Sequence, residues 1–186
     1  MDVRMIIGLV GEHGAGKDTI ARYLASEYKF KHISTGDIVR QHTKKLRGTT
    51  GDRVLQHEVA IKLRKDHGTK FLVKEALADK HSRLVISGLR HPDEVRAIKA
   101  SHGVVLYVTA NEKNRYARIK ARNSTRDQLD FKAFLQQETS ERQNDDVFAQ
   151  HLDTVLSMSD FKIENDGGLD DLHEAVDAFI HKYFAV

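Results

Sequence analysis

A glycine-rich turn between an apolar segment and a helix-forming segment is the feature that most constrains how this chain can fold. Residues 6–10 read as a buried strand, and residues 11–19 follow it without a break. Three closely spaced glycines let successive backbone N–H groups converge on an anion, and the N-terminus of the next helix adds positive potential. The stretch therefore predicts a phosphate-binding loop, in which Lys17 reaches the outer phosphates of a nucleotide. The other loop residues that we expect to line these phosphates are Gly11, His13, Gly14, Ala15 and Gly16.

The residue after this lysine departs from the usual order. Loops of this kind place a serine or threonine directly after the lysine, where its hydroxyl binds Mg²⁺. Here Asp18 takes that position and Thr19 follows it. Thr19 is therefore the expected hydroxyl ligand of Mg²⁺. Asp18 either lies near the same metal ion or only complements the positive end of the helix.

Length and composition fit a single domain that spans residues 1–186. With 186 residues, 40% of them hydrophobic, the chain can bury a sizeable core. Its 30 basic and 27 acidic side chains give a net charge of +3, which is too small to indicate nucleic-acid binding. The chain has no cysteine, no apolar run of membrane-spanning length and no signal-peptide pattern at its start. We expect a cytoplasmic monomer or homodimer that acts on a small molecule and binds neither membranes nor nucleic acid.

Apolar periodicity predicts strands that alternate with helices, which indicates an α/β fold with a mainly parallel, five-stranded sheet. The expected strands are residues 5–10, 31–34, 84–87, 104–109 and 161–164. The expected helices are residues 18–28, several pieces within 35–80 with a break at 48–51, and residues 92–101, 112–122, 129–143, 147–157 and 169–183.

Two further segments follow predicted strands, at the edge where open parallel sheets bind ligands. The first runs from Ser34 to Arg40, and the second contains Gly88 and Arg90. An arginine side chain matches the geometry of a phosphate group, so both arginines are candidate ligands of an acceptor phosphate. The alternatives are that residues 35 and 37 only cap a helix and that the arginines lie on an ordinary solvated surface.

Arginines also recur later in the chain. Arg115, Arg118 and Arg122 are spaced to form one stripe on a helix. Phosphoryl transfer spreads negative charge over three oxygens and calls for such cations, although charged stripes are usually only solvated faces. Asn165 follows the last predicted strand, in a sequence that is more typical of a plain strand-to-helix turn than of a nucleotide-binding loop.

These segments resemble the P-loop nucleoside monophosphate kinases. Gly16-Lys17-Asp18-Thr19 is similar to Gly-Lys-Gly-Thr of adenylate kinases and to Gly-Lys-Asp-Thr of some deoxynucleoside monophosphate kinases. The segment from Ile33 to Arg40 resembles Ile-Ser-Thr-Gly-Asp-Met-Leu-Arg of adenylate kinases, and Gly88 and Arg90 match their Asp-Gly-Phe-Pro-Arg and the Asp-Gly-Ile-Arg of archaeal P-loop kinase-like proteins. Residues 118–122 are similar to the lid hinge of these kinases, and residues 161–169 resemble the end of dephospho-coenzyme A kinases.

The resemblance implies a three-layer P-loop kinase fold with strand order 2-3-1-4-5, a helical acceptor-binding segment at about residues 35–80 and a small helical lid at about residues 115–143. It implies transfer of the γ-phosphate of ATP, with Mg²⁺, to a small nucleotide. It implies that the catalytic residues are Lys17, Arg118, Arg122 and Asp37. Asp37 would orient the acceptor or take its proton. It implies that ATP is bound by the loop residues named above and by Asp18, Thr19, Arg118 and Asn165. Asp18 and Thr19 would also bind the metal ion. The residues that it places on the acceptor are Thr35, Gly36, Arg40, Gly88 and Arg90.

One position departs from this pattern. Ser87 stands where the family has an aspartate that anchors the water shell of Mg²⁺, so another carboxylate must replace it for full catalysis. Ser87 therefore leaves open a nucleotide-binding regulatory protein with weakened chemistry. The modest basic excess leaves open an ATPase that acts on RNA or on a protein assembly, and a kinase similar to dephospho-coenzyme A kinase is a further alternative.

Overall fold

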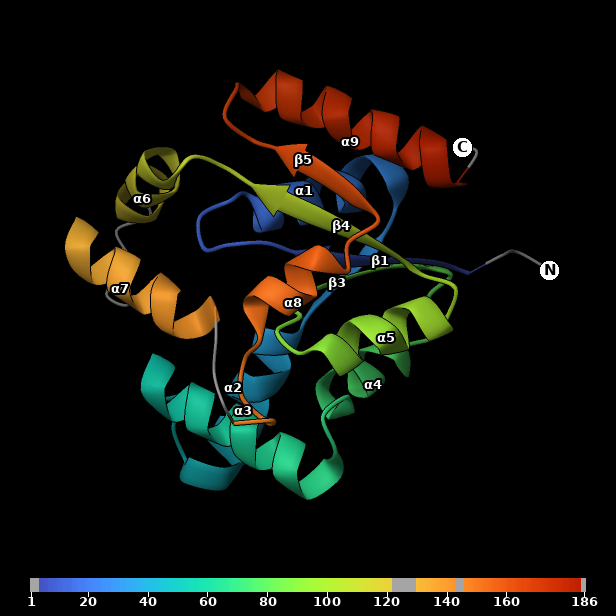
Figure 1. The fold of residues 1–186 in the computed structure, drawn as a ribbon. Helices are drawn as coiled ribbons and strands as arrows, with labels where there is room; N and C mark the ends of the chain where they lie inside the picture. Colours follow the sequence, from blue (N-terminus) through green and yellow to red (C-terminus); the bar gives the residue numbers. More distant parts are fainter. Residues whose placement is uncertain (1–3, 122–129, 143–145, 185–186) are drawn as a thin grey trace.

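The computed structural model describes residues 4–121, 130–142 and 146–184. Strands and helices alternate along the chain (Figure 1). In chain order the elements are β1 (Met5–Val10), α1 (Lys17–Tyr28), β2 (Lys31–Ser34), α2 (Thr35–Arg47), α3 (Arg53–His67), α4 (Phe71–Leu77), β3 (Arg83–Ser87), α5 (Pro92–Ala100), β4 (Val104–Thr109), α6 (Glu112–Ala121), α7 (Phe131–Arg142), α8 (Leu152–Ser157), β5 (Phe161–Glu164) and α9 (Leu169–Phe184).

The five strands form one parallel sheet in the order β2-β3-β1-β4-β5, which confirms the predicted order. β1 lies in the middle, and its Leu9 pairs with Ser87 of β3 and with Leu106 of β4. Ser34, the last residue of β2, also pairs with Ser87. This register brings the carboxyl ends of β2, β3 and β1 to one edge of the sheet.

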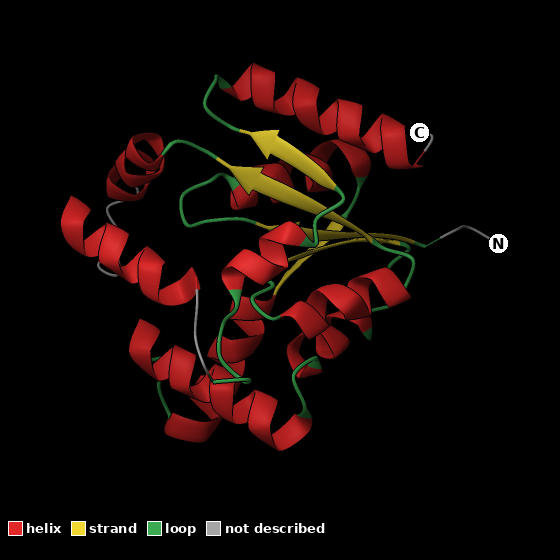
Figure 2. Cartoon of the chain, viewed as in Figure 1, coloured by secondary structure: helices red, strands yellow, loops and turns green. Residues whose placement is uncertain are grey.

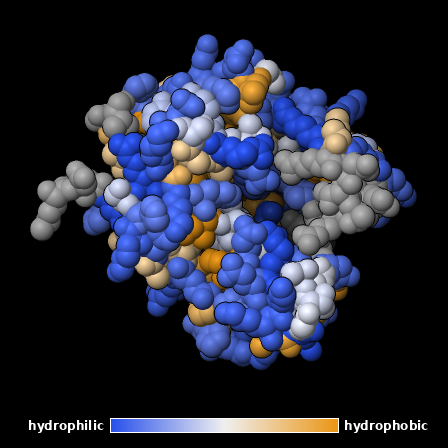
Figure 3. All heavy atoms as spheres, turned by 180° about the vertical axis from the view of Figure 1, so that it is seen from behind, coloured by the Kyte–Doolittle hydropathy of each residue, from blue (hydrophilic) through white to orange (hydrophobic). Residues whose placement is uncertain are grey.

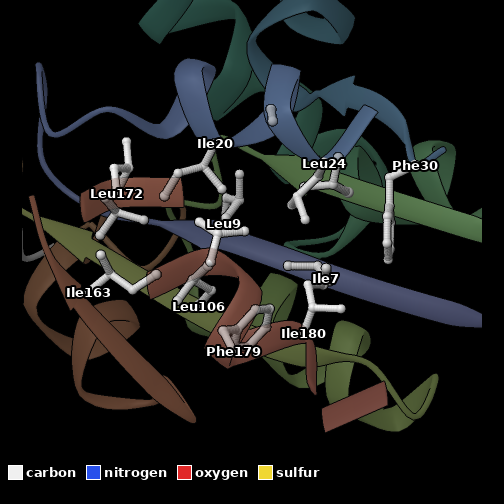
Figure 4. Packing of buried hydrophobic residues seen from close by; sticks show 14 of the residues in the cluster. Ile7, Leu9, Ile20, Leu24, Phe30, Leu106, Ile163, Leu172, Phe179 and Ile180 are labelled. Carbon is white, nitrogen blue, oxygen red and sulfur yellow. The ribbon is translucent and has the colours of Figure 1, made fainter. Parts of the chain in front are cut away.

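Helices cover both faces of the sheet, as the apolar strands require. On one face α1 and α9 pack against the strands, and Figure 4 shows Ile20 and Leu24 of α1 above Leu9 and Ile7, with Phe179 and Ile180 of α9 beside them. On the other face α4, α5 and α8 pack against a second apolar cluster around Ile86. A third small cluster joins α2, α3 and α4 and makes the segment between β2 and β3 a compact helical unit.

The loops that leave the carboxyl ends of the strands begin at one edge of the sheet, beyond the arrowheads in Figure 2. Helices α6 and α7 lie beyond the arrowheads of β4 and β5 (Figure 1). The predicted helix over residues 147–157 is shorter than expected, since α8 begins at Leu152. The backbone before it is held by other partners: the Asp146 carboxylate accepts from the backbone N–H of Phe148, and the His151 N–H donates to the Arg90 carbonyl.

The surface is mainly hydrophilic in the view of Figure 3, with small separate apolar areas. The large apolar side chains that are most exposed are Leu46, Val54, Val147 and Leu169. Among the residues described, no helix is both long and apolar enough to cross a membrane.

Candidate active site

The loop between β1 and α1 has the backbone of a tight anion-binding turn. Gly11 and Gly16 adopt φ values of 148° and 108°, a region that residues with a Cβ rarely adopt. A Cβ at Gly11 would collide with the carbonyl oxygen of Val108, and one at Gly16 would collide with the side-chain amide of Asn165. Both glycines are therefore required by close packing as well as by backbone conformation. The chain is folded tightly enough here for main-chain N–H groups, rather than side chains, to face an anion.

Lys17 is the first residue of α1 and turns back over this loop. Its Nζ donates to the carbonyl oxygens of Gly11 at 2.8 Å and Glu12 at 2.7 Å. The cation thus lies next to the N-terminus of α1, where positive potential from the helix adds to its own charge. Asp18 is exposed in the first turn, and the Thr19 hydroxyl accepts from Arg22 at 3.3 Å. This set of a cation, a hydroxyl and a carboxylate at a helix N-terminus fits a nucleotide phosphate with its metal ion.

Asn165, directly after β5, supports the loop from one side. Its side-chain amide donates to the carbonyl of Ala15 at 2.8 Å, and its own backbone N–H donates to Thr109 at 2.7 Å. Arg118 of α6 donates to the carbonyl of Asn165 at 2.8 Å, and its Nη1 is buried without a hydrogen bond to any residue in the described part of the chain. Arg118 therefore lies at the loop with donor capacity to spare, as a phosphate ligand requires.

The predicted arginine stripe is not a single exposed face. Arg115 is only 2% exposed, and it donates to the carbonyls of Ala110 at 2.9 Å and His13 at 3.3 Å and pairs with Glu138 of α7. The helix turns Arg115 and Ile119 inward as its buried face, so Arg115 holds α6 and α7 against the loop. Arg122 lies outside the described residues.

The two predicted acceptor segments meet at the ends of β2 and β3. The Thr35 hydroxyl, which is buried, donates to the carbonyl of Gly88 at 2.7 Å. Gly88 has φ 83°, and a Cβ there would be 2.7 Å from the same hydroxyl. Neither Thr35 nor Asp37 is the N-cap of α2, because Ser34 holds that position. Arg40 pairs with Asp37 on the exposed surface of the same helix, a contact that a ligand phosphate can replace at little cost.

The turn that carries Arg90 is anchored by buried charges. Glu94, which is fully buried, accepts from the backbone N–H groups of Arg90 at 2.7 Å and His91 at 3.1 Å. Its other oxygen pairs with the Arg64 guanidinium of α3 at 3.0 Å, and Arg64 is itself 2% exposed. His91 caps α5 by accepting from the Asp93 N–H at 3.1 Å, and burial lowers the pKa of its ring. The helical acceptor segment is thus tied directly to the turn after β3.

Ser87 is the last residue of β3 and lies beside the end of β2, between the two acceptor segments. It is 4% exposed, and its hydroxyl lies 2.8 Å from Nε2 of His32 on β2. Burial lowers the pKa of His32, although the negative charges of Asp18 and Asp37 oppose that shift. A neutral serine and histidine therefore occupy the place where a carboxylate was expected.

With this geometry in place, the sequence can be compared with known families. A family model described as an AAA domain matches residues 7–146. The chain belongs to this family. A UPF0200 protein of Pyrobaculum aerophilum is 31% identical over 165 residues, which span 87% of each chain. Among solved structures, this AAA domain is similar to shikimate kinase from Acinetobacter baumannii in complex with shikimate, with a TM-score of 0.59 and 18% identity over 97% of this chain and 95% of the other. Shikimate kinase from Bacteroides thetaiotaomicron is similar with a TM-score of 0.61 and 13% identity, over 96% of this chain and 97% of the other.

These matches confirm that this AAA domain has the P-loop kinase fold that the sequence predicted. The strand ends bring the phosphate-binding loop, residues 34–40 and residues 87–90 to one edge of the sheet, while Arg118 and Asn165 lie on the far side of the loop. Sequence reasoning missed four side chains at this edge: Glu12, His32, Arg64 and Glu94. The position of Glu94, three residues after the helix cap, is a signal that a search for capping boxes would have found. The other three have no local signal, because their partners lie on other elements.

Proposed function

We propose that this protein transfers the γ-phosphate of ATP to a small nucleotide-like acceptor, as nucleoside monophosphate kinases do. The observation that carries the proposal is the hydrogen bond from Thr35 to Gly88, which joins the two acceptor segments beside the phosphate-binding loop. β3 pairs with both β1 and β2, so donor and acceptor phosphates would meet where these three strands end. Open parallel sheets bind their ligands at this edge.

On the donor side we assign ATP to the loop from Gly11 to Thr19. Bound Mg²⁺ would neutralise part of the phosphate charge, and the Thr19 hydroxyl and the Asp18 carboxylate are the groups that would hold it. No group of three or more histidine, aspartate or glutamate side chains suited to a metal ion occurs among the described residues. A metal ion here would therefore depend on the nucleotide phosphates, which is how Mg²⁺ commonly binds.

The remaining side chains would align the reactants and balance charge. Lys17, Arg118 and Arg122 would face the transferred phosphoryl group, and positioned cations of this kind account for most of the catalysis in phosphoryl transfer. Arg40 and Arg90 would hold an anionic group of the acceptor, with Thr35, Gly36 and Gly88 shaping its site. Asp37, paired with Arg40, would orient the acceptor. Asn165 would act through the loop, because its amide supports Ala15.

A panel of acceptors tests the proposal. Purified protein is incubated with ATP and Mg²⁺ and, one at a time, with ribo- and deoxynucleoside monophosphates, dephospho-coenzyme A and shikimate. ADP release and the phosphorylated acceptor are both quantified by chromatography. We expect ADP release to equal phosphorylated product for at least one acceptor. ADP release with no phosphorylated acceptor would instead identify an ATPase.

A second candidate is a nucleotide-binding regulatory protein with weak chemistry. The hydrogen-bonded pair of Ser87 and His32 favours it, because neither group brings the negative charge that a metal ion needs at this strand end. ATP binding in a calorimeter without turnover of any acceptor would support this candidate over the kinase.

A further inference from the structure

Glu12 is a buried carboxylate inside the phosphate-binding loop. Its side chain is 6% exposed, and its Oε1 accepts a hydrogen bond of 2.8 Å from the hydroxyl of Tyr107 on β4. Its Oε2 is buried and accepts no hydrogen bond from any residue that the structure describes. Leaving a charged oxygen buried and unpaired is costly, so such an atom calls for a partner that is supplied from outside the chain.

Neither Arg142 nor Lys17, two cations beside Glu12, forms a hydrogen bond with Oε2. Arg142 of α7 lies 3.7 Å from Oε1, while its Nη1 is bound at 2.9 Å to Asp153 of α8. Lys17 donates to the backbone carbonyl of Glu12 at 2.7 Å. Burial, followed by the hydrogen bond to Glu12, raises the pKa of Tyr107 to about 12, so this hydroxyl stays a donor at neutral pH. Oε2 is thus left as a strong acceptor with a free lone pair.

The hydrogen-bond partner of Glu12, Tyr107, lies on the same face of the sheet as the helices next to Arg90. Tyr107 packs on the face of the sheet that is covered by α5 and α8. The residue before α8, His151, donates its backbone N–H to the carbonyl of Arg90 at 2.9 Å. The opposite side of the loop, at Ala15, is occupied by Asn165. Glu12 and Arg90 are therefore linked through the same helix, on the side away from Asn165.

We propose that Glu12 is the proton acceptor for a hydroxyl group of the acceptor, which narrows the substrate class to small anionic alcohols. This inference rests on the proposed transfer of the γ-phosphate of ATP, and it replaces the acceptor phosphate of a nucleoside monophosphate with a hydroxyl group. A phosphate oxygen that attacks the γ-phosphorus is already deprotonated and needs no base, whereas an alcohol has a proton to give. Arg40 and Arg90 bind the anionic group of the same molecule, and Glu12 binds its hydroxyl.

The step balances without any further reactant. The hydroxyl oxygen forms a bond to the γ-phosphorus as the bond from that phosphorus to the β–γ bridging oxygen breaks. The electron pair of the broken bond leaves with ADP. The hydroxyl proton passes to Oε2 of Glu12 and from there to solvent when the product leaves.

The variant Glu12→Gln tests the proposal, because an amide keeps the acceptor for Tyr107 but cannot take a proton. Dephospho-coenzyme A serves as the anionic alcohol, and the nucleoside monophosphates serve as phosphate acceptors. With the alcohol we expect kcat to fall by about 10²–10⁴-fold, while the Kd of ATP in calorimetry and the melting temperature stay within error. We also expect the variant to lose the acid limb of the pH profile, which is the fall in kcat at low pH.

A second variant keeps the test valid if Glu12→Gln folds poorly. Tyr107→Phe leaves the carboxylate in place and removes its hydrogen-bond donor, which disfavours the charged form. The fall in kcat at low pH is then expected to move to higher pH, because the carboxylate has lost its hydrogen-bond donor.

Three outcomes would overturn the assignment. One is transfer to phosphate acceptors alone, at equal rates in wild type and Glu12→Gln. Another is a fall in kcat that is the same in Glu12→Gln, in Arg142→Gln and in the double variant, with an unchanged fall in kcat at low pH. Glu12 would then only hold Arg142 in place. The third is a Tyr107→Phe profile identical to wild type. If wild type phosphorylates no acceptor at all, the proposed function itself fails, which is a distinct result.

Discussion

The hydroxyl of Ser87, the last residue of β3, and the ring Nε2 of His32 on the neighbouring strand β2 lie 2.8 Å apart. The pair joins neighbouring strands, and the negative charge of Asp18 acts on the imidazole. A neutral hydrogen-bonded pair at this place has a direct consequence for metal binding.

Ser87→Asp is expected to keep or raise turnover and to lower the Mg²⁺ concentration at half-maximal rate. The new carboxylate would lie beside His32 and raise the pKa of the imidazole, because an opposite charge favours the protonated form. NMR titration of the histidine and a Mg²⁺ titration of turnover measure both effects. Asp18→Ala should raise the Mg²⁺ requirement, and adding Ser87→Asp should reverse part of that change. Loss of turnover in Ser87→Asp at every Mg²⁺ concentration would refute a metal role at this strand end.

Lys17→Ala is expected to reduce turnover by at least about 10²-fold, which corresponds to about 3 kcal/mol of lost charge stabilisation. The fold should persist, since the side chain is only partly buried and bonds to two loop carbonyls. Steady-state kinetics and circular dichroism measure the two effects. Lys113→Ala, an exposed lysine of α6, is the matched control and should change neither. Near-normal turnover in folded Lys17→Ala would remove the basis for a phosphate-binding role.

Arg40→Ala should weaken acceptor binding far more than ATP binding, because Arg40 is proposed to contact only the acceptor. Arg96→Ala is a close control: it breaks a pair with Asp93 that has the same i,i+3 spacing as the pair of Arg40 and Asp37. We expect Arg96→Ala to affect neither affinity, and Arg90→Ala to behave like Arg40→Ala. Calorimetry with each ligand measures both affinities, and an equal loss of ATP affinity in Arg40→Ala would place that arginine at the donor instead.

Glu94→Gln should destabilise the fold by about 3–5 kcal/mol. The variant leaves the buried guanidinium of Arg64 without its 3.0 Å counter-ion, although the amide oxygen can still accept from the backbone of Arg90. Urea unfolding monitored by circular dichroism measures the change. Asp66→Asn breaks the exposed pair with Lys62 and should change stability little. Equal stabilities for the two variants would mean that the buried pair adds nothing to the fold.

Stability is expected to rise with pH up to about 6.5, the ordinary pKa of histidine. Burial lowers the pKa of His91 in the folded protein, so the unfolded chain binds the proton more readily and acid favours unfolding. Protonation would also remove the acceptor that caps the Asp93 N–H. His91→Asn keeps a capping oxygen and does not titrate, so its unfolding free energy should depend less on pH across this window. An unchanged slope in the variant would assign the pH dependence to other groups, such as His32.

The resemblance to the P-loop kinases implied the strand order. The alternation of strands and helices and the phosphate-binding loop followed from the sequence itself. These features depend on local patterns: apolar runs, glycines that permit positive φ, and a lysine at the start of a helix. The same logic located the Thr35 to Arg40 and Gly88 to Arg90 segments, because each directly follows a strand. Helix 147–157 was overpredicted because periodicity does not register the long-range bond from His151 to Arg90.

Only the tertiary structure decided which side chains surround the loop and how they are paired. Arg115 was expected on a basic stripe, yet it is buried against His13 and Glu138, which lie 102 and 23 residues away in the chain. The pairs of Ser87 with His32, Glu94 with Arg64, and Glu12 with Tyr107 also join residues far apart in sequence. Hydrogen bonds and charge pairs act over a few ångströms in space, so the partners of these residues are set by the packing of strands and helices and leave no periodic trace in the sequence.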